Sequence, residues 1–159
     1  MRVLFVGINP GVRSSITGHH FAGFSNRFWK LLVDARLVPE PITFTDDDRL
    51  PEWGYGITNL IRRPTPGIDT LRPEEYVAGR ARLRAKVLRY RPSVVALVGV
   101  TVFRAMCPAH TGAVTLGLQR ERIGDSAVFV LPNPSGRNAN FTYAEMLAAF
   151  RKLRRYATM

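Results

Sequence analysis

The stretch that decides the fold is Val3-Leu4-Phe5-Val6-Gly7-Ile8-Asn9-Pro10-Gly11. Its first four residues form an uninterrupted apolar run, which is typical of a strand covered on both faces in a parallel sheet. The loop that follows lies at the carboxyl edge of the sheet, where open α/β folds bind ligands, and it presents Asn9 between two glycines. Asparagine, proline and glycine are also the commonest turn formers, so these residues alone are equally consistent with a tight turn.

The composition indicates a basic chain with the length of one domain. Of its 159 residues 46% are hydrophobic, so residues 1–159 suffice for a single domain with a substantial core. The formal net charge is +11, from 23 Lys and Arg against 12 Asp and Glu, and such a surface attracts polyanions. Nucleic acid is therefore the first partner to expect, although coding bias alone also produces arginine-rich chains.

Cysteine content and hydropathy exclude several classes of protein. Cys107 is the single cysteine, which excludes an intrachain disulfide, a four-cysteine zinc site and a cluster held by four thiolates. No stretch approaches the roughly 20 apolar residues of a membrane helix, and the first apolar run is a core strand rather than a signal peptide. We therefore expect a soluble cytoplasmic protein with no membrane association.

Predicted strands and helices alternate along the remaining chain. Strands are predicted at 55–61, 93–99 and 126–131, and helices at 26–33, 73–90, 102–106 and 143–156. Residues 12–24 and the proline-rich, acidic stretch 39–51 are expected to be irregular, and 114–118 is either a strand or a loop. This alternation, with right-handed crossovers, predicts a three-layer α/β/α domain around a mostly parallel central sheet of four or five strands.

The longest predicted helix, 73–90, begins at a proline, which suits the first helical position, and has two glutamates in its first turn. Its arginines are assigned to a solvated face. Its packing stripe is expected to consist of Tyr76, Val77, Leu83, Val87 and Leu88.

A second loop is predicted at the same edge of the sheet as the first. Residues 132–139 follow the strand at 126–131, which runs parallel to the first strand, so the two loops converge. Each loop carries an Asn-Pro pair beside a glycine, Asn9-Pro10 in the first and Asn133-Pro134 in the second. Two facing loops of this kind favour a functional site over two independent turns.

Four blocks of sequence, in order between residues 3 and 156, resemble a known family. They are Gly7-Ile8-Asn9-Pro10-Gly11, then Phe21-Ala22 with Asn26-Arg27-Phe28-Trp29-Lys30, then Arg63-Pro64-Thr65, and Asn133-Pro134-Ser135-Gly136. These blocks closely resemble the mismatch-specific uracil-DNA glycosylases and thymine-DNA glycosylases. The resemblance implies the uracil-DNA glycosylase fold and the use of no metal or cofactor. It also implies the reaction: uracil, and in some members thymine, is extruded from mismatches with guanine in double-stranded DNA and removed by hydrolysis.

The resemblance also implies roles for individual residues. Asn9 matches the catalytic asparagine that positions the attacking water, and a neutral amide suffices because uracil leaves as a delocalised anion that donors stabilise. Backbone N–H groups near Ile8 and Phe21 are implied to bind the base edge, with the Phe21 ring stacking on the base and Ser14 near its C5 side. The implied base pocket consists of Gly7, Ile8, Gly11, Ser14 and Phe21.

Residues 133–139 match the loop that enters the gap left by the base and contacts the widowed guanine. The implied DNA-binding residues are Asn133, Pro134, Ser135, Gly136, Arg137 and Asn138. Arg137 departs from the pattern of bacterial relatives, in which an apolar wedge is expected at its position. An arginine can fill a gap by stacking and can also hold a phosphate, so discrimination of the opposite base is open to change.

Asp69 and the pair His19-His20 are two further departures. Asp69 is either part of an ordinary Asx turn or a second catalytic group, which supplies the base that Asn9 cannot be. The histidines replace more apolar residues, and no Asp, Glu or Cys is near them in the sequence. A solvated or DNA-contacting pair is therefore favoured over a metal site.

The sequence thus predicts a monomeric, monofunctional uracil-DNA glycosylase of base excision repair that prefers G·U mismatches, with G·T mismatches and modified pyrimidines left open. One alternative is a non-catalytic module that binds mismatched or damaged DNA. Another is a mononucleotide-binding α/β protein, although neither a G-x-G-x-x-G nor a Walker sequence is present.

Overall fold

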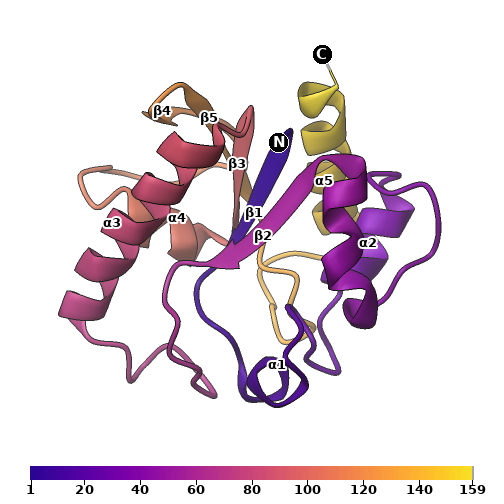
Figure 1. Ribbon diagram of the computed structural model, residues 1–159, viewed down its shortest axis with the longest axis horizontal. Coiled ribbons are helices and arrows are strands. Elements are labelled where there is room, and N and C mark those ends of the chain that lie inside the picture. Colours follow the sequence, from indigo (N-terminus) through magenta and orange to yellow (C-terminus); the bar gives the residue numbers. More distant parts are fainter. Residues whose placement is uncertain (159) are drawn as a thin grey trace.

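A five-stranded sheet forms the centre of the computed structural model, which describes residues 1–158 (Figure 1). The strand order is β2-β1-β3-β5-β4, with β4 antiparallel to β5 and all other neighbours parallel. The strands are β1 (Val3–Gly7), β2 (Tyr55–Asn59), β3 (Val94–Val98), β4 (Gly117–Ile123) and β5 (Ser126–Leu131). The predicted mostly parallel central sheet is therefore confirmed.

Helices cover both faces of this sheet, as the three-layer prediction requires (Figure 1). The helices α2 (Phe28–Asp34) and α5 (Tyr143–Ala157) pack on one face, and α3 (Pro73–Tyr90) and α4 (Val100–Met106) pack on the other. Side chains of β1 alternate between the two cores, with Phe5 on the α2 and α5 side and Val6 on the α3 and α4 side. The inner strands β1, β3 and β5 are buried along their whole length, which explains their uninterrupted apolar sequences.

Three segments differ from the sequence prediction. Residues 12–24 contain the short helix α1 (Val12–Thr17), and 39–51 overlap a 3₁₀ helix, η1 (Phe44–Trp53). Neither has an apolar stripe long enough to signal a helix, because α1 buries no residue and η1 buries only Leu50. The ambiguous stretch 114–118 leads into β4, an edge strand that alternates exposed and half-buried residues.

Helix α3 has the predicted bounds and part of the predicted packing stripe, since Tyr76 packs against the core together with Leu83 and Val87. Leu83 and Val87 are buried, whereas Val77 is 58% and Leu88 50% exposed. The helix instead approaches the chain through Gly79, where a Cβ atom would lie 2.5 Å from the carbonyl oxygen of Leu60. This close backbone approach rotates the buried face away from Val77 and Leu88.

None of the helices within residues 1–158 has the length and apolar character that crossing a membrane requires.

Candidate active site

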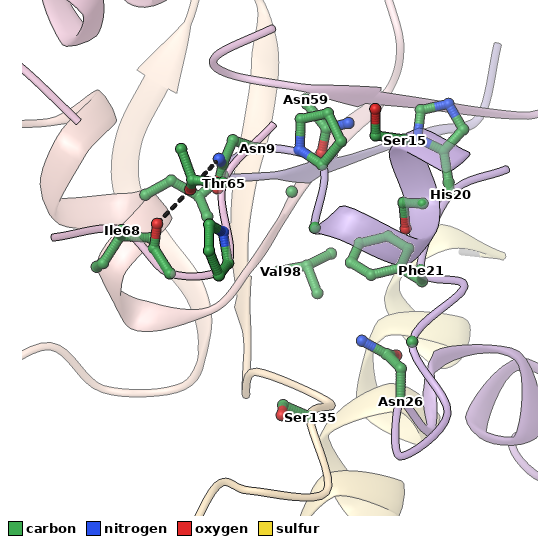
Figure 2. Close-up of a pocket in the computed structure, with 18 of the residues that line it drawn as sticks. Asn9, Ser15, His20, Phe21, Asn26, Asn59, Thr65, Ile68, Val98 and Ser135 are labelled. Carbon is green, nitrogen blue, oxygen red and sulfur yellow. Dashed lines mark hydrogen bonds between the residues drawn. The ribbon is translucent and has the colours of Figure 1, made fainter. Parts of the chain in front are cut away.

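A cavity of about 440 Å³ opens at the carboxyl edge of the sheet (Figure 2). The ends of β1, β2, β3 and the loop after β5 contribute to its lining, together with α1 and the segment that follows it. The structure brings all predicted base-pocket residues and the predicted catalytic asparagine to this lining: Gly7, Ile8, Asn9, Gly11, Ser14 and Phe21. Two separate loops therefore converge on one site, as the strand directions predicted.

The Asn9 amide is held in a single orientation. Its Nδ2 donates to the backbone oxygen of Arg63 at 2.9 Å and to the Thr65 hydroxyl at 2.8 Å. A backbone oxygen can only accept, so the group that faces Arg63 must be the NH₂ group. Asn9 Oδ1 is then left as an acceptor with no hydrogen bond from residues 1–158, which is what holding a water molecule requires.

Thr65 and Arg63 support Asn9 from a loop more than 50 residues further along the chain. Thr65 is 5% exposed, and its backbone N–H donates to the carbonyl oxygen of Pro10 at 3.1 Å, next to Asn9. The Arg63 side chain is fixed in turn by an ion pair with Glu75 at 3.0 Å. Arg63-Pro64-Thr65 was one of the matched sequence blocks, but no role was predicted for it. The local signal for a site residue was a threonine between two prolines.

Phe21 forms one wall of the cavity. Its backbone lies in the left-handed region, at φ +49°, which non-glycine residues rarely adopt. One face of its ring packs on Phe28, with centroids 4.3 Å apart and planes inclined by 30°, and the ring also lines the cavity (Figure 2). A flat aromatic surface of this kind suits stacking on a planar base.

Gly7 and Asn59 lie beside this aromatic wall. A Cβ atom on Gly7 would lie 2.7 Å from Asn59 Oδ1 and 3.2 Å from the Phe21 ring, so a side chain there would displace the Asn59 amide and press against the ring. Asn59 ends β2 and lines the cavity, and its amide makes no side-chain hydrogen bond within the described part of the chain. Asn59 was not among the predicted site residues, because nothing local in the sequence distinguishes it from any polar residue that ends a strand.

The segment before Phe21 is clamped from two sides. One Asp47 oxygen accepts from the His20 backbone N–H at 2.9 Å, and the other pairs with His19 Nδ1 at 2.9 Å. Trp29 Nε1 donates to the His20 backbone oxygen at 3.0 Å. No carboxylate was expected near the two histidines. That expectation is wrong, because folding brings Asp47 to both of them.

His19 and His20 both line the cavity, and burial lowers the pKa of His20, so its imidazole is neutral at pH 7. Within residues 1–158 no group of three or more His, Cys, Asp or Glu side chains is placed to hold a metal ion. The histidine pair is thus a part of the cavity wall whose geometry Asp47 and Trp29 set.

The predicted DNA-contacting loop lies across the cavity from Asn9, and only Asn133 and Ser135 of its predicted residues line the cavity. The loop is docked on the segment before α2, because the Arg27 N–H donates to the Pro134 oxygen at 2.9 Å. Gly136 N–H likewise donates to the Ser25 oxygen at 2.8 Å. Asn138 fixes the loop internally through a 3.0 Å bond to the Asn133 oxygen, and Arg137 is exposed.

Asp69 is not brought to the cavity. It is exposed and follows Ile68, which does line the cavity, and its carboxylate makes no hydrogen bond within the described chain. The cavity lining includes no Asp or Glu at all. Of the two residues predicted to be catalytic, the structure therefore places only Asn9 in the site.

Replacing Asp69 by asparagine is expected to change the rate of any reaction in the cavity by less than about threefold, as for other exposed substitutions. The measurement is the single-turnover rate on a uracil-containing duplex between pH 6 and 9. A tenfold loss together with a changed pH profile would instead identify Asp69 as a general base.

Comparison with known proteins agrees with this geometry. The sequence matches the Uracil DNA glycosylase superfamily over residues 1–154. It is also 42% identical over 147 residues to a G/U mismatch-specific uracil DNA glycosylase of Schizosaccharomyces pombe, an alignment that covers 87% of this chain and 45% of that protein. The chain therefore spans less than half the length of this curated relative. With the matched residues extending from β1 into α5, the chain belongs to the uracil DNA glycosylase superfamily.

Proposed function

We propose that this chain is a monofunctional DNA glycosylase, which extrudes uracil from duplex DNA and hydrolyses its N-glycosidic bond. The observation that carries the proposal is the Asn9 amide, whose Oδ1 is a free, oriented acceptor in a cavity walled by Phe21. The preference for uracil opposite guanine is supported by the similarity to the fission yeast enzyme, which is named for G/U mismatches.

The cavity residues divide the reaction between them. Asn9 Oδ1 holds a water molecule for attack on C1′, while the uracil leaves as an anion whose charge is spread over its ring and oxygens. The backbone N–H groups of Ile8 and Phe21 make no hydrogen bond within residues 1–158, so they are available to the polar edge of the base. The Asn59 amide offers a further donor and acceptor at the same edge.

A neutral amide makes this a modest catalyst. Asn9 cannot take the proton of the water, and no carboxylate lines the cavity to stabilise positive charge on the sugar. The same observation favours a second candidate function, a module that binds mismatched DNA without cleaving it.

One assay separates the two candidates. A duplex carrying one labelled G·U pair is incubated with the protein, and abasic sites are revealed by alkaline strand cleavage. Abasic product from wild type supports the glycosylase, whereas tight binding with no product at any enzyme concentration supports the binding module. A matched G·C duplex controls for nonspecific cleavage.

Substrates beyond uracil depend on the space beside Ser14. Its hydroxyl is engaged, because it accepts a 3.1 Å hydrogen bond from the Ala22 N–H, so a C5 substituent of the base meets a small, fixed side chain. Excision from G·T and from duplexes with 5-substituted uracils measures this tolerance.

A monomeric, single-domain state and a cytoplasmic location stay predictions from the sequence.

Affinity for duplex DNA is expected to fall steeply with salt, by at least about tenfold between 50 and 200 mM, because binding releases counterions from phosphates. The net charge of +11 supplies the field that drives this binding. Fluorescence anisotropy with an uncleavable duplex measures the slope. A flat profile would show that the arginine-rich surface makes no phosphate contacts.

A further inference from the structure

Phe24 is the most exposed large hydrophobic side chain of the described residues, at 89%. It lies in the segment between Phe21, which walls the cavity, and the start of α2. Single exposed apolar residues are common on proteins, but a full phenyl ring beside a site implies a binding role when its conformation is held.

Arg13 holds this ring from α1. Its guanidinium lies 3.7 Å from the centroid of the Phe24 ring, and its Nε donates to the Ala22 backbone oxygen at 2.7 Å. The same guanidinium lies 5.5 Å from the centroid of Phe44. One face of the Phe24 ring is thus supported by an anchored cation, while its exposure leaves the other face to solvent.

Phe24 and Arg137 line one groove of about 640 Å³ next to the cavity. The groove shares Gly11, Ser14 and Ser135 with the cavity lining, so the two spaces are adjacent. The hydrogen bond from Gly136 N–H to the Ser25 oxygen joins the two segments that carry Arg137 and Phe24. A Cβ atom on Gly136 would lie 2.7 Å from that oxygen, so this junction requires glycine.

The chemistry of the groove favours nucleic acid over an apolar protein segment. Arg13 and Arg137 both line it, and no Asp or Glu does. Extrusion of one nucleotide removes a stacking partner from each base next to the gap, and an aromatic ring can replace such a partner. Arg137 stands at the position of the expected apolar wedge, and Pro134 is buried, so the loop 133–138 offers no exposed apolar side chain for this task.

We propose that Phe24 supplies this apolar side chain. Its ring stacks on a base of the duplex beside the extruded nucleotide, while Arg137 lines the same groove. This assignment rests on the proposed function, since the gap exists only when a base is extruded. It makes Phe24 a DNA-binding residue that acts on duplex substrates.

The test uses a duplex in which a 2′-fluorinated deoxyuridine opposite guanine resists cleavage and 2-aminopurine is the neighbouring base. Phe24→Ala is expected to lose about tenfold in affinity, the effect of removing one stacking contact, and to lose the 2-aminopurine fluorescence change seen with wild type. Phe24→Trp is expected to keep both. Ile16→Ala is the matched control, because Ile16 is 79% exposed on α1 but lines neither the cavity nor the groove.

The inference is overturned if Phe24→Ala matches wild type in both duplex affinity and 2-aminopurine fluorescence. This result must hold with 2-aminopurine on either side of the extruded nucleotide. Thermal melting confirms that the variants fold, as the exposure of Phe24 leads us to expect. Uracil excision by wild type, measured in parallel on the natural substrate, reports on the proposed function alone. A fluorescence change that depends on Phe24 supports stacking even if no uracil is excised, and excision with no dependence on Phe24 removes only the stacking role.

Discussion

Replacing Asn9 by alanine is expected to lower the single-turnover rate of uracil excision from a G·U duplex by about 10²- to 10⁴-fold, the range for loss of a group that positions or activates the nucleophile. The change removes the free Oδ1 acceptor but leaves the Phe21 wall and the surface of the protein intact. Duplex affinity, measured by anisotropy with an uncleavable substrate, is therefore expected to stay within about threefold of wild type.

Thr65→Val is the matched control, because it disturbs the orientation of the Asn9 amide without removing the amide. It keeps the volume of the side chain but removes the hydroxyl that accepts from Asn9 Nδ2. An amide held only by the Arg63 oxygen is less well oriented, so a loss of about tenfold is expected, smaller than that of Asn9→Ala. Excision by Asn9→Ala at the wild-type rate would contradict the assignment of Asn9 as the group that holds the water.

Gly7→Ala is expected to lower the excision rate and the affinity for the extruded base together, with a combined loss of about 10²-fold, because a displacement of about 1 Å at a reacting centre has an effect of this size. The added Cβ would lie 2.7 Å from Asn59 Oδ1 and 3.2 Å from the Phe21 ring, so the Asn59 amide has to shift and the Phe21 ring has to give way slightly. Single-turnover rates at several enzyme concentrations separate the two contributions.

Gly11→Ala, in the loop that follows β1, is the comparison for Gly7→Ala. No atom lies within 4 Å of a Cβ atom built on Gly11, and its φ of −74° suits any residue. It adds a methyl group to the pocket lining without displacing any atom, so it is expected to lose less activity than Gly7→Ala, and circular dichroism with thermal melting shows whether both variants are folded. Equal losses in the two variants would show that the loop is sensitive to any side chain, not to the space beside Phe21.

The sequence predicted the parts of the site that are local in the chain. The apolar run of β1 required a buried parallel strand, and the position of Asn9 directly after it placed that amide at the ligand-binding edge. The same reasoning brought the loop after β5 to the same edge, which the lining by Asn133 and Ser135 confirms. The role of Asn9 and the base pocket came from the family resemblance, and the structure gathers those residues around one cavity.

Residues that act through distant partners were missed. Asp47 holds the backbone before Phe21 from 27 residues away, and Thr65 holds the Asn9 amide from 56 residues away. Neither pairing leaves a periodic or spaced signal, because a side chain that reaches across a loop is constrained by the final position of both segments. Asp69 was a candidate second catalytic group because Asn9 cannot act as a base, yet Asp69 is exposed and does not line the cavity.

By itself the sequence determined the layer architecture, the parallel inner strands and the edge at which the cavity opens, since burial on two faces and strand direction follow from runs of neighbouring residues. Only the tertiary structure decided which side chains complete the site. The rotation of α3 depends on Gly79 meeting the Leu60 backbone, and the orientation of the Asn9 amide depends on acceptors from a remote loop. Contacts between distant segments arise when the chain closes on itself, so the physical cause of the site's geometry lies in packing rather than in any local pattern.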